Sequence, residues 1–579
     1  MEQLSFDFVV VGGGMSGLCA AIAAARHGAR TALVHARPMP GGNASSEIRM
    51  HICGADDHMR RPNARETGII EEILLEHKRR NPANSYAVFD SILWEKAAFC
   101  ENLTLLLNTC VDGVTMRKGR IESVTAYQQT TEKRMTLCAP LFADATGDGS
   151  LGAWAGADFV VGREARSAYD EPHAPEKADH CTMGNSLMFK ARDAGHPVPF
   201  IKPDWANTYT EHDLRRRIHE DVTSGYWWIE LGGEQDTIAD TQTLNMELLK
   251  IAFGVWDHIK NRGDHGADNW ELEWVGFLPG KRESRRYEGD YMLTQQDLST
   301  GRPFPDVVAY GGWTMDNHLP AGFYAPGYSS HHLPVNAPYP IPYRCLYSRN
   351  IDNLMFAGRN ISASHLAMSS TRVMATCSLM GQAAGAAAAL AVEKTCDPRG
   401  IYQDHMAELQ RRLMDDGCYL PGLVRKPAPV QIDLPSEQLS ILQNGWERPH
   451  VGVENRILLP AGTRLTITLP APAYRQALRL ALDPDFSRES ISPRKKYQDF
   501  AMRAHVFADD PPLQMPAPLL REATLICEMP DGSVSLKLKN HQALLRIPLP
   551  DGASRLTLCL ESSWGGGDIG LYGCEIMDV

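Results

Sequence analysis

The chain has 579 residues, of which 43% are hydrophobic and 22% charged, and its formal net charge at pH 7 is −12. This length exceeds what one hydrophobic core supports, so two to four domains are expected. The acidic balance and the lack of a basic run argue against a nucleic-acid partner. The 13 cysteines are scattered and form no C-x-x-C pair, which is typical of buried thiols rather than of a disulfide framework.

No membrane partner is expected either, because no charge-free stretch of about 18 apolar residues stands out. The chain also begins with a predicted strand instead of a basic segment followed by a hydrophobic signal region. Cytoplasmic location is therefore the default expectation.

The most informative pattern stands at the amino terminus. The apolar run at 6–11 leads into the glycine turn at 12–17, and an Ala-rich helix is predicted over 18–27. A strand, a G-x-G-x-x-G turn and a helix in this order are the dinucleotide fingerprint. Gly12 permits the tight turn, Gly14 lets the backbone approach a pyrophosphate, and Gly17 lets the helix pack close to the strand. The helix N-terminus then faces the phosphates.

The second predicted strand, 29–36, departs from the usual nucleotide fold. Such folds place an acidic residue at this strand's end, where it binds a ribose hydroxyl. Here the strand ends in Val34-His35-Ala36-Arg37 without an acid. His35 is expected to bind the ribose instead, and NAD(P) stays open as a competitor for the turn.

Between residues 38 and 149, the spacing of apolar residues predicts helices followed by short strands. A Gly-rich loop spans 38–47, and helices are predicted at 64–80 and 88–100. Short strands are predicted at 103–107, 111–117, 120–129, 133–138 and 141–143. Lys118-Gly119 joins two of them as a hairpin, and Asp144–Gly149 forms another tight turn.

The middle of the chain differs in character, with many Trp, Tyr, Arg and His residues. Helices are predicted at 211–224 and 241–262, and 311–343 is expected to run irregularly. The nucleotide-fold pattern returns at 353–359. Helices are then predicted at 371–392 and 403–415.

A linker with Pro421, Pro427 and Pro429 precedes a stretch of alternating strands and turns. Strands are predicted at 463–469, 477–482, 501–507, 533–538, 543–547 and 555–561, most simply a β-sandwich. The sequence thus predicts an α/β protein: a Rossmann-like FAD-binding domain with an inserted substrate domain, plus a C-terminal all-β sandwich-like module. The expected boundaries are 1–160 with 341–420 for the nucleotide domain, 161–340 for the substrate or cap domain, 421–435 for the linker and 436–579 for the β module.

Several separate motifs carry a resemblance to a known family. They are G-G-N-A-S-S-E-I-R at 41–49, A-T-G-D-G at 145–149, P-G-K-R-E-S-R-R at 279–286, I-P-Y-R-C at 341–345, A-G-R-N-I-S-A-S-H at 357–365, S-T-R-V-M-A-T-C at 370–377 and Gly381-Gln382. In this order they resemble the FAD-dependent oxidoreductases related to the fumarate reductase and succinate dehydrogenase flavoproteins. The resemblance covers about residues 1–420. Family members often stand beside polysaccharide-degradation genes, and some are named xanthan lyases.

The resemblance implies FAD as the cofactor and implies which segments surround it. The expected cofactor-binding residues are Gly12, Gly14, Ser16, Gly17, His35, Ala36, Arg37, Gly41, Gly42, Asn43, Ser45, Ser46, Ala145, Thr146, Gly147, Asp148, Gly358, Arg359, Ser370 and Thr371. A helix N-terminus aimed at the flavin would stabilise negative charge on the reduced ring. Ser369, Ser370 and Thr371 are suitable N-caps for that helix.

Two histidines are the candidates for catalysis, since dehydrogenation of an alcohol needs a base for the hydroxyl proton. His365 lies between the A-G-R segment and the predicted flavin-facing helix, and a structural histidine is the equally weighted alternative. His51 follows the Gly-rich loop and is the second choice. His51 or Cys53 also offers a site for covalent FAD attachment.

Substrate contacts are expected from the aromatic-rich segment and from arginines. His331 and His332 lie where binding residues concentrate, with plain surface exposure as the alternative. Arg282, Arg286 and Arg344 suit a carboxylate, a sulfate or a polar sugar face, and ion pairing inside the protein is their alternative. The tryptophans Trp227, Trp228, Trp270, Trp274 and Trp313 offer sugar stacking, although core packing is favoured.

The sequence predicts no metal site. Two sets of candidate ligands stand close in sequence, His51 with Asp56, Asp57 and His58, and Asp264 with His265 and Asp268. Neither matches a known ligand spacing.

The leading functional hypothesis is an FAD enzyme that oxidises a CH–OH group of a carbohydrate, glycoside or polyol, with hydride passing to flavin N5. A redox-neutral variant of this hypothesis eliminates a glycosidic substituent and returns the hydride from the flavin. The first alternative is a fumarate-reductase-like enzyme that reduces or forms a C=C bond in a small carboxylate. The second alternative is a non-catalytic carbohydrate-binding flavoprotein. The most distant alternative is a tRNA-modifying flavoprotein. Expected partners are a small-molecule substrate and an electron acceptor that the sequence leaves unidentified, and a homo-oligomer stays open.

Overall fold

The computed structural model describes residues 2–57, 60–219, 222, 225–489 and 512–578. Its contacts divide the chain into two compact units. Unit 1 comprises 1–55, 84–409 and 500–511, and unit 2 comprises 56–83, 410–499 and 512–579. The strand predicted at 501–507 lies outside the described residues.

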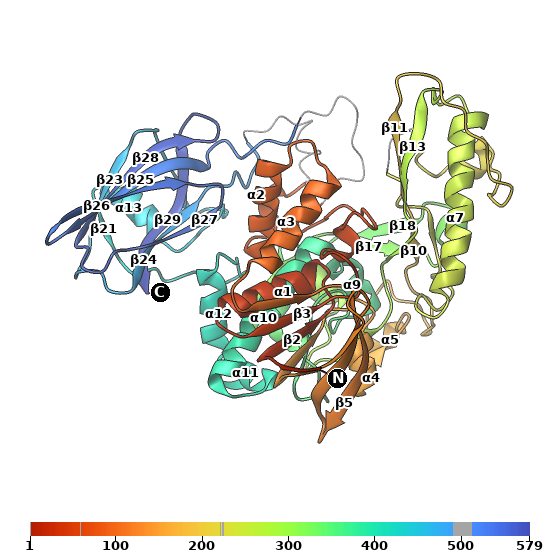
Figure 1. Ribbon diagram of the computed structural model, residues 1–579, viewed down its shortest axis with the longest axis horizontal. Coiled ribbons are helices and arrows are strands. Elements are labelled where there is room, and N and C mark those ends of the chain that lie inside the picture. The colour runs from red at the N-terminus through yellow and green to blue at the C-terminus, as the bar shows by residue number, and fades with distance from the viewer. Residues whose placement is uncertain (1, 58–59, 220–221, 223–224, 490–511, 579) are drawn as a thin grey trace. The chain divides into compact units, whose positions relative to one another are not determined.

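A five-stranded parallel sheet is the centre of unit 1 (Figure 1). Its order is β20 (Leu354–Phe356), β8 (Leu141–Asp144), β2 (Phe8–Val11), β3 (Thr31–Val34) and β4 (Leu103–Leu106). All residues of β2, β3, β8 and β20 are buried, as expected for parallel strands covered on both faces. The Rossmann-like arrangement predicted from the first 17 residues is present, and the segment after position 353 supplies an edge strand of the same sheet.

Helices α1 (Met15–Arg26) and α10 (Met374–Lys394) lie side by side (Figure 1). Their axes approach closely because α10 carries glycines at the crossing. A Cβ on Gly381 would stand 2.1 Å from the Ser16 carbonyl oxygen, and one on Gly385 would stand 2.0 Å from that of Ala20. Helix α10 has the length and mean hydropathy (1.4) of a membrane span, yet 94% of its apolar window is buried inside the protein. It is a core helix here, and the other described helices lack this combination of length and hydropathy.

A second, four-stranded sheet in unit 1 has the order β1 (Glu2–Ser5), β7 (Lys133–Cys138), β6 (Arg120–Gln128) and β5 (Thr109–Arg117). The predicted hairpin turn joins β5 to β6 in antiparallel register. Lys118 and Gly119 have φ angles of 51° and 77°, the left-handed conformation that a two-residue hairpin turn requires.

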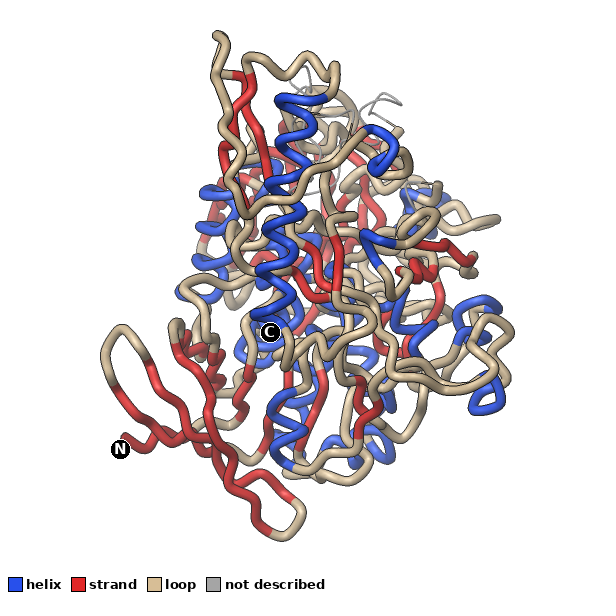
Figure 2. The backbone as a smooth tube through the Cα atoms, turned by 90° about the vertical axis from the view of Figure 1, so that its right-hand side faces the viewer, coloured by secondary structure: helices blue, strands red, loops and turns tan. Residues whose placement is uncertain are grey.

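The middle segment is built around helix α7 (Thr241–Asp257), which continues into a π-helical turn, η3 (His258–Arg262). Figures 1 and 2 show α7 running along the antiparallel pair of strands β11 (Phe189–Asp193) and β13 (Trp270–Val275). Phe189, Leu248 and Trp256 share one buried cluster there. In the described part of the helix predicted at 211–224, α6 covers Glu211–Leu214. Residues 220–221 and 223–224 of that prediction lie outside the described residues. Trp228 belongs to the same cluster, and Trp227 and Trp270 pack against it, so the contacts of these tryptophans favour core packing.

The segment 311–343 was expected to be irregular, but it contains paired strands. β16 (Val307–Gly311) pairs with β19 (Tyr339–Pro342), and β17 (Met315–His318) pairs with β18 (Ser330–Leu333). The strands are short and separated by Gly- and Pro-rich turns, so their periodicity does not emerge from the sequence.

The predicted N-cap of the flavin-facing helix is wrong. The sequence placed it at Ser369–Thr371, but these residues lie inside a separate helix, α9 (His365–Thr371). Ser364 caps α9 by accepting a hydrogen bond from the Ala367 N–H, and α10 starts after Val373. A serine does cap a helix in this segment, as the sequence suggested, but the serine is Ser364 and the helix is α9, which precedes α10.

The remaining described elements of unit 1 are α3 (Tyr86–Ala98), α4 (Ser150–Ala155), β9 (Phe159–Val160), α5 (Arg166–Tyr169), β10 (Asn185–Ser186), β12 (Glu230–Leu231), β14 (Gly280–Lys281), β15 (Arg286–Tyr287), α8 (Gln295–Thr300) and α11 (Pro398–Asp404). Short 3₁₀ turns occur at Gly42–Ala44, Gly322–Tyr324 and Tyr343–Cys345.

Unit 2 contains two antiparallel sheets with one shared core. The first has the order β21 (Gln431–Ile432), β23 (Arg464–Thr468), β28 (Arg555–Ser563), β25 (Leu520–Met529) and β26 (Gly532–Lys539), and the second β22 (Ile457–Leu459), β29 (Ile569–Asp578), β24 (Gln476–Leu482) and β27 (Leu544–Pro548). Leu465 and Leu558 of one sheet and Leu480 and Leu571 of the other belong to one buried cluster. The predicted sandwich-like module corresponds to these two sheets.

Residues 56–83 were expected in the nucleotide domain, but they group with unit 2. This segment contains a 3₁₀ turn at Pro62–Ala64 and helix α2 (Ile69–Arg80). Leu75 of α2 belongs to the buried cluster of unit 2, and Glu76 forms ion pairs with Arg79 and His541. The segment is thus held by partners more than 400 positions later, which local sequence patterns do not reveal. Unit 2 also contains α13 (Ser436–Leu442), and α12 (Met406–Asp415) spans the boundary between the two units.

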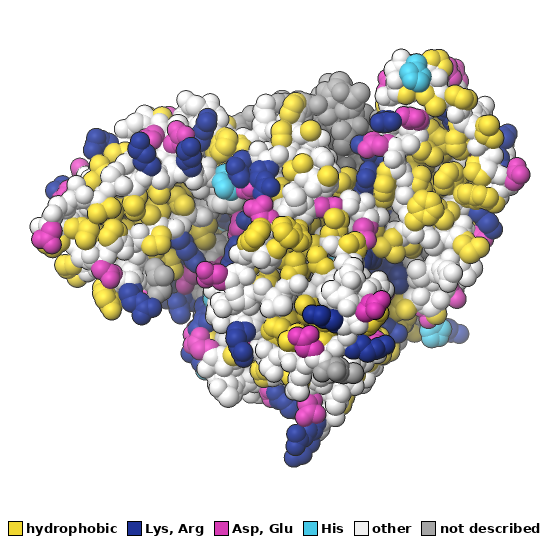
Figure 3. All heavy atoms as spheres, viewed as in Figure 1, with side chains coloured by type: hydrophobic (Ala, Val, Ile, Leu, Met, Phe, Trp, Pro, Cys, Tyr) yellow, Lys and Arg dark blue, Asp and Glu magenta, His cyan; other side chains and the backbone are white. Residues whose placement is uncertain are grey.

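On the face shown in Figure 3, the Lys and Arg side chains of the described residues are interspersed with Asp and Glu side chains.

Candidate functional site

The glycine turn between β2 and α1 has the geometry that a bound pyrophosphate requires. Gly12 has a φ angle of 109°, and a Cβ there would stand 2.2 Å from the Ala145 carbonyl oxygen. A Cβ on Gly17 would stand 1.9 Å from the Gly12 carbonyl oxygen. By contrast, a Cβ on Gly14 would meet no protein atom within 4 Å. Gly12 and Gly17 therefore serve the fold, whereas the space beside Gly14 fits a ligand that approaches the backbone.

Three buried polar atoms near this turn and in the late motifs have no hydrogen-bond partner among the described residues: Ser16 Oγ, Asn360 Oδ1 and Thr371 Oγ1. Ser16 and Asn360 lie together, because a Cβ on Gly358 would stand 3.7 Å from the Ser16 Cβ and 3.5 Å from Asn360 Oδ1. An unmet buried polar group is costly. A polar cofactor beside the N-terminus of α1 would satisfy such atoms, so the residues fit FAD.

His35 follows the last residue of β3, at the position where nucleotide folds usually place a ribose-binding acid. Its Nδ1 accepts a hydrogen bond from the Gly13 N–H at 2.9 Å. Burial, and then the charge of Arg37, lowers the pKa of His35 to about 4, although the Met39 backbone opposes the shift. The ring is therefore neutral and braces the glycine turn. Arg37 Nη1 lies 3.7 Å from Glu47 Oε2. The neighbouring Ala36 is exposed.

The Gly-rich loop contacts the turn directly. Gly41 and Gly42 have φ angles of 113° and 58°, and Gly41 forms a bridge with Gly14. Asn43 Nδ2 donates to the Lys281 carbonyl oxygen at 3.2 Å. The Ser45 hydroxyl donates to the Gly42 carbonyl oxygen, and the Ser46 N–H donates to Asp90. The loop is thus ordered next to the glycine turn.

The A-T-G-D-G turn joins two distant motifs through ion pairs. Asp148 accepts from Arg359 Nη2 and from Lys281 Nζ, both at 2.7 Å. Burial alone would raise the pKa of Asp148, but the charges of Arg359 and Lys281 hold it below its ordinary value. Arg359 also donates to the Gly147 carbonyl oxygen. Thr146 instead hydrogen-bonds Asp144. Motifs at 145–149, 279–286 and 357–365 therefore meet in space.

His365 is the first residue of α9 and is held at both ring nitrogens. Its Nδ1 lies 3.0 Å from Glu283 Oε2, and its Nε2 lies 3.0 Å from Asn317 Oδ1. The side chain is buried. Burial would raise the pKa of Glu283, but the charges of His365 and Arg286 keep it below its ordinary value. A carboxylate that orients a histidine beside an open space is the usual arrangement of a proton-transfer site.

A cavity of about 130 Å³ adjoins His365. Its polar lining includes Glu164, Glu171, His173 and Asn317. Burial raises the pKa of Glu171, although its hydrogen bonds from the Ser364 hydroxyl and the Gln295 N–H oppose this. The Arg163 side chain also lines the cavity, and it is paired with Asp179. The lining thus offers hydrogen-bond donors and acceptors from carboxyl, imidazole and amide groups.

The three arginines expected to bind substrate have partners within the protein. Arg286 is buried and pairs with Glu283 and Glu164. Arg282 lies 3.4 Å from buried Glu230 and donates to the Ser186 hydroxyl at 2.7 Å. Arg344 pairs with both oxygens of Asp306. These contacts favour ion pairing, the alternative that the sequence left open, over direct contact with a substrate.

His331 and His332 lie in β18 opposite Asn317 and Asp316 of β17. Both histidines are exposed. His332 Nδ1 lies 3.1 Å from the Thr314 hydroxyl. This pair of strands also presents Asn317 to His365, so the two histidines stand on the scaffold of the cavity.

Ser370 and His51 are placed by their neighbours. The Ser370 hydroxyl donates to the Trp313 carbonyl oxygen at 2.5 Å and contacts the Tyr339 hydroxyl, so internal partners hold it. The segment after His51 lies against the start of α10, where the Ala375 N–H donates to the Cys53 carbonyl oxygen at 3.1 Å. The roles of His51 in proton transfer and in covalent attachment stay predictions.

Sequence reasoning missed the partners of His365. Glu283 lies within the P-G-K-R-E-S-R-R motif, where it was considered only as an ion-pair partner of the arginines. Asn317, Glu164 and Glu171 stand in no motif. Glu164 accepts from the His365 N–H at 2.9 Å. A signal was available for Glu283 alone, since a single acid among four basic residues suggests a buried ion pair.

The chain is similar to known flavoproteins. A family model described as "FAD dependent oxidoreductase" matches residues 7–413, more than half of the chain. Among solved structures, a geranylgeranyl bacteriochlorophyll reductase-like protein of Thermoplasma acidophilum has 13% identity and a TM-score of 0.34, and the match covers 72% of this chain and 86% of that one. A p-nitrophenol 4-monooxygenase of Pseudomonas putida has 9% identity, a TM-score of 0.32, and coverage of 72% and 89%.

No curated protein matches the chain. The structural similarities have low scores and carry no argument by themselves, so the assignment depends on the family match. That match spans the glycine turn, the A-T-G-D-G turn and the segment that carries His365. The chain belongs to the family of FAD-dependent oxidoreductases and is an enzyme with FAD as its cofactor.

Proposed function

We propose that this enzyme oxidises a CH–OH group of a hydroxyl-rich substrate, a carbohydrate, glycoside or polyol, with His365 as the proton acceptor. The observation that carries the proposal is the position of His365: it is held between Glu283 and Asn317 at the wall of a polar cavity. FAD, when bound, supplies the two-electron acceptor for the hydrogen that leaves carbon. The protein must then accept the hydroxyl proton.

The surroundings of His365 suit this role. The Glu283 carboxylate accepts the Nδ1–H, which fixes the tautomer and stabilises the imidazolium that forms when Nε2 takes a proton. The Asn317 side-chain amide lies at Nε2, on the strand that borders the cavity. Nε2 accepts a hydrogen bond there when the amide presents its NH2 group, because an amide oxygen can only accept. A substrate hydroxyl that replaced this contact would place its proton within hydrogen-bond distance of the base.

The cavity lining favours a neutral substrate over a dicarboxylate. Glu164 and Glu171 contribute carboxyl groups, and the nearby cations Arg163 and Arg286 are already paired with Asp179, Glu283 and Glu164. A dicarboxylate would meet carboxylates without an unpaired arginine to neutralise it. Hydroxyl groups, in contrast, form hydrogen bonds with the carboxyl, imidazole and amide side chains of this lining. The fumarate-reductase-like alternative therefore lacks the arginine clamp that it needs.

The cavity contacts do not distinguish net oxidation from the redox-neutral elimination variant, and both use the same proton acceptor. We also propose the cytoplasm as the compartment, which agrees with thirteen scattered cysteines that form no C-x-x-C pair. A carbohydrate-binding role for unit 2 and a homo-oligomer stay predictions.

The proposal is tested by flavin absorbance under anaerobic conditions. The purified holoenzyme is mixed with a panel of sugars, glycosides and polyols, and separately with a panel of saturated and unsaturated dicarboxylates. We expect bleaching of the oxidised flavin by a member of the first panel and none by the second. Bleaching by a saturated dicarboxylate such as succinate, or reoxidation of reduced enzyme by fumarate, would contradict the proposal. Either result would support the fumarate-reductase-like alternative, which reduces or forms a C=C bond. Turnover of a glycoside without net bleaching identifies the redox-neutral variant.

A further inference from the structure

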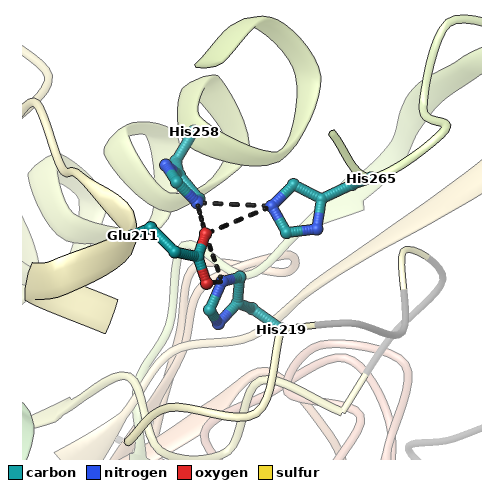
Figure 4. A group of neighbouring side chains, drawn as sticks. All are labelled: Glu211, His219, His258 and His265. Atoms are coloured by element: carbon teal, nitrogen blue, oxygen red, sulfur yellow. Dashed lines mark hydrogen bonds and ion pairs between the residues drawn. The ribbon is translucent and has the colours of Figure 1, made fainter. Parts of the chain in front are cut away.

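Four side chains of the middle segment converge on one point (Figure 4). They are Glu211 of α6, His219 from the loop after α6, His258 at the start of the π-helical turn, and His265 from the loop that follows. One ligand atom from each lies within 4.8 Å of all the others. His219 and His258 are buried, whereas the Glu211 side chain is 68% exposed. All four belong to unit 1 and none lines the cavity at His365.

The spacing of these atoms matches the edges of a coordination tetrahedron. Zinc binds imidazole nitrogen and carboxylate oxygen at about 2.0–2.2 Å, which separates neighbouring ligand atoms by about 3.4 Å in a tetrahedron. Here His258 Nε2 lies 2.9 Å from Glu211 Oε2 and 3.3 Å from His265 Nε2. His219 Nε2 lies 3.2 Å from Glu211 Oε1, and His265 Nε2 lies 3.9 Å from Oε2.

The three imidazole rings are arranged almost symmetrically. Their centroids are 5.1, 5.2 and 5.3 Å apart, and the interplanar angles are 62–67°. Rings in direct contact for packing alone need not present the same atom to a common centre. In this cluster each histidine presents Nε2, and the carboxylate of Glu211 completes the fourth corner (Figure 4).

Backbone carbonyl groups select the nitrogen that points inward. His219 Nδ1 lies 2.5 Å from the Arg217 carbonyl oxygen, and His258 Nδ1 lies 3.3 Å from that of Tyr209. A carbonyl oxygen only accepts, so both Nδ1 atoms carry hydrogen and the Nε2 atoms face the cluster. Metal-binding histidines are typically oriented by such a bond at the other ring nitrogen. Three Nε2 atoms and a carboxylate that converge in this way form a donor set for a cation.

The local backbone holds these ligands in place. His258 begins a π-helical turn, a feature that occurs frequently at functional sites. The loop that carries His265 is tied back by Lys260 Nζ, which donates to the Ala267 and Asp268 carbonyl oxygens at 2.7 and 2.6 Å. Ile259 and Ala267, next to two of the ligands, belong to the buried apolar cluster of this segment. An apolar surround limits water access and strengthens metal coordination.

We propose that Glu211, His219, His258 and His265 form a four-coordinate zinc site. The four protein ligands fill a tetrahedral shell, which is the mark of a structural zinc rather than a catalytic one with an open position. The ion would join α6, the end of α7 and the intervening loops, which the sequence separates by up to 54 positions. Imidazole-rich sites with one carboxylate suit zinc among the abundant divalent metals, whereas Mg²⁺ and Ca²⁺ prefer oxygen ligands.

The first test is the metal content of the full-length holoenzyme, purified without a metal-affinity step and analysed by plasma mass spectrometry. We expect about one zinc per chain, as a closed structural site predicts. His258→Gln and His219→Gln should lose this zinc, while His196→Gln should retain it, because His196 is an exposed histidine outside the cluster. Equal zinc in all four proteins, or none in the wild type after growth with added zinc, would overturn the proposal.

A second measurement guards against variants that fail to fold. Wild-type enzyme is stripped with a chelator and titrated with Co²⁺, whose visible d–d absorption is intense only in a tetrahedral site. We expect saturation at one equivalent, displacement by Zn²⁺ and a rise in the thermal midpoint on zinc addition. Absence of the tetrahedral spectrum together with an unchanged thermal midpoint would identify the cluster as protonated histidines paired with Glu211, and the zinc proposal would fail.

Discussion

The backbone N–H of Gly13 donates a hydrogen bond to Nδ1 of His35 at 2.9 Å. This bond joins the glycine turn to the end of the second strand, the position where related nucleotide folds place a ribose-binding acid. Because Nδ1 accepts, the buried ring is neutral, and protonation would break the bond. The stability of the turn therefore depends on pH.

The first prediction concerns this pH dependence. His35 has a pKa of about 4 in the folded protein against about 6.5 in the unfolded chain, so the unfolded chain binds the proton more readily between these values. The stabilising contribution is complete above about pH 6.5 and is lost as the pH falls towards 4, by an amount on the order of 3 kcal/mol.

The variant His35→Asn isolates this contribution. Its side-chain oxygen can accept from the Gly13 N–H, but it does not titrate in this range. Thermal midpoints measured from about pH 7 to about pH 4 should fall less steeply in His35→Asn than in the wild type. His196→Gln, at an exposed site, should keep the wild-type slope. Parallel curves for wild type and His35→Asn would show that His35 is not the titrating group.

The second prediction separates folding from cofactor binding within the glycine turn. An alanine at 14 adds a methyl group to open space, whereas one at 12 meets the Ala145 carbonyl oxygen at a strained backbone angle. Gly14→Ala should leave the thermal midpoint of the FAD-free protein nearly unchanged but weaken FAD binding about tenfold or more, that is, by at least about 1.4 kcal/mol. Gly12→Ala should destabilise the FAD-free protein itself. Unchanged FAD affinity in Gly14→Ala would show that the pyrophosphate does not bind at this turn.

The third prediction uses the contact between α1 and α10. Alanine at 385 would improve helix propensity by about 1 kcal/mol, but its Cβ would stand 2.0 Å from the Ala20 carbonyl oxygen. Overpacking of this kind typically costs about 1–3 kcal/mol, and more against backbone. We therefore expect Gly385→Ala to lower the thermal midpoint, whereas Gly567→Ala, with no atom within 4 Å, should leave it unchanged. A raised midpoint would mean that propensity outweighs packing.

The parts of this molecule that follow local rules were predictable. The strand, glycine turn and helix at the amino terminus form because apolar spacing and glycine conformation act within about 20 residues. The hairpin at Lys118 and Gly119 follows from the same short-range logic. The ion pairs that join Asp148 to Arg359 and Lys281 link motifs more than 100 positions apart and were not predicted.

The parts that depend on distant partners were not predictable. The metal-ligand geometry at Glu211 and His265 needs two loops and a helix end to meet, and no ligand spacing in the sequence announces it. The segment 56–83 groups with a unit whose other residues lie beyond position 409. Arginines 282, 286 and 344 resembled substrate ligands because sequence shows a cation but not the buried carboxylate beside it. The N-cap of α10 was misplaced because a break at Arg372 and Val373 divides what the composition presents as one long helix.

The fourth prediction concerns the proton acceptor. Glutamine at 365 retains a hydrogen-bonding side chain but cannot take a proton, so kcat for substrate-dependent flavin reduction should fall about 10²- to 10⁴-fold. The fall should be in kcat with little change in KM, since the group acts on the reacting hydroxyl rather than on remote parts of the substrate. His196→Gln again serves as the control.

Glu283→Gln distinguishes positioning from proton transfer. The variant keeps an oxygen beside His365 but removes the charge that stabilises the imidazolium, so kcat should fall by less than in His365→Gln. It also leaves Arg286 paired with Glu164 alone, so the thermal midpoint should fall as well. The double variant should be no slower than His365→Gln, because Glu283 acts through the histidine. Additive losses would show that Glu283 acts independently, and a full kcat in His365→Gln would require another base, for which His51 is the next candidate.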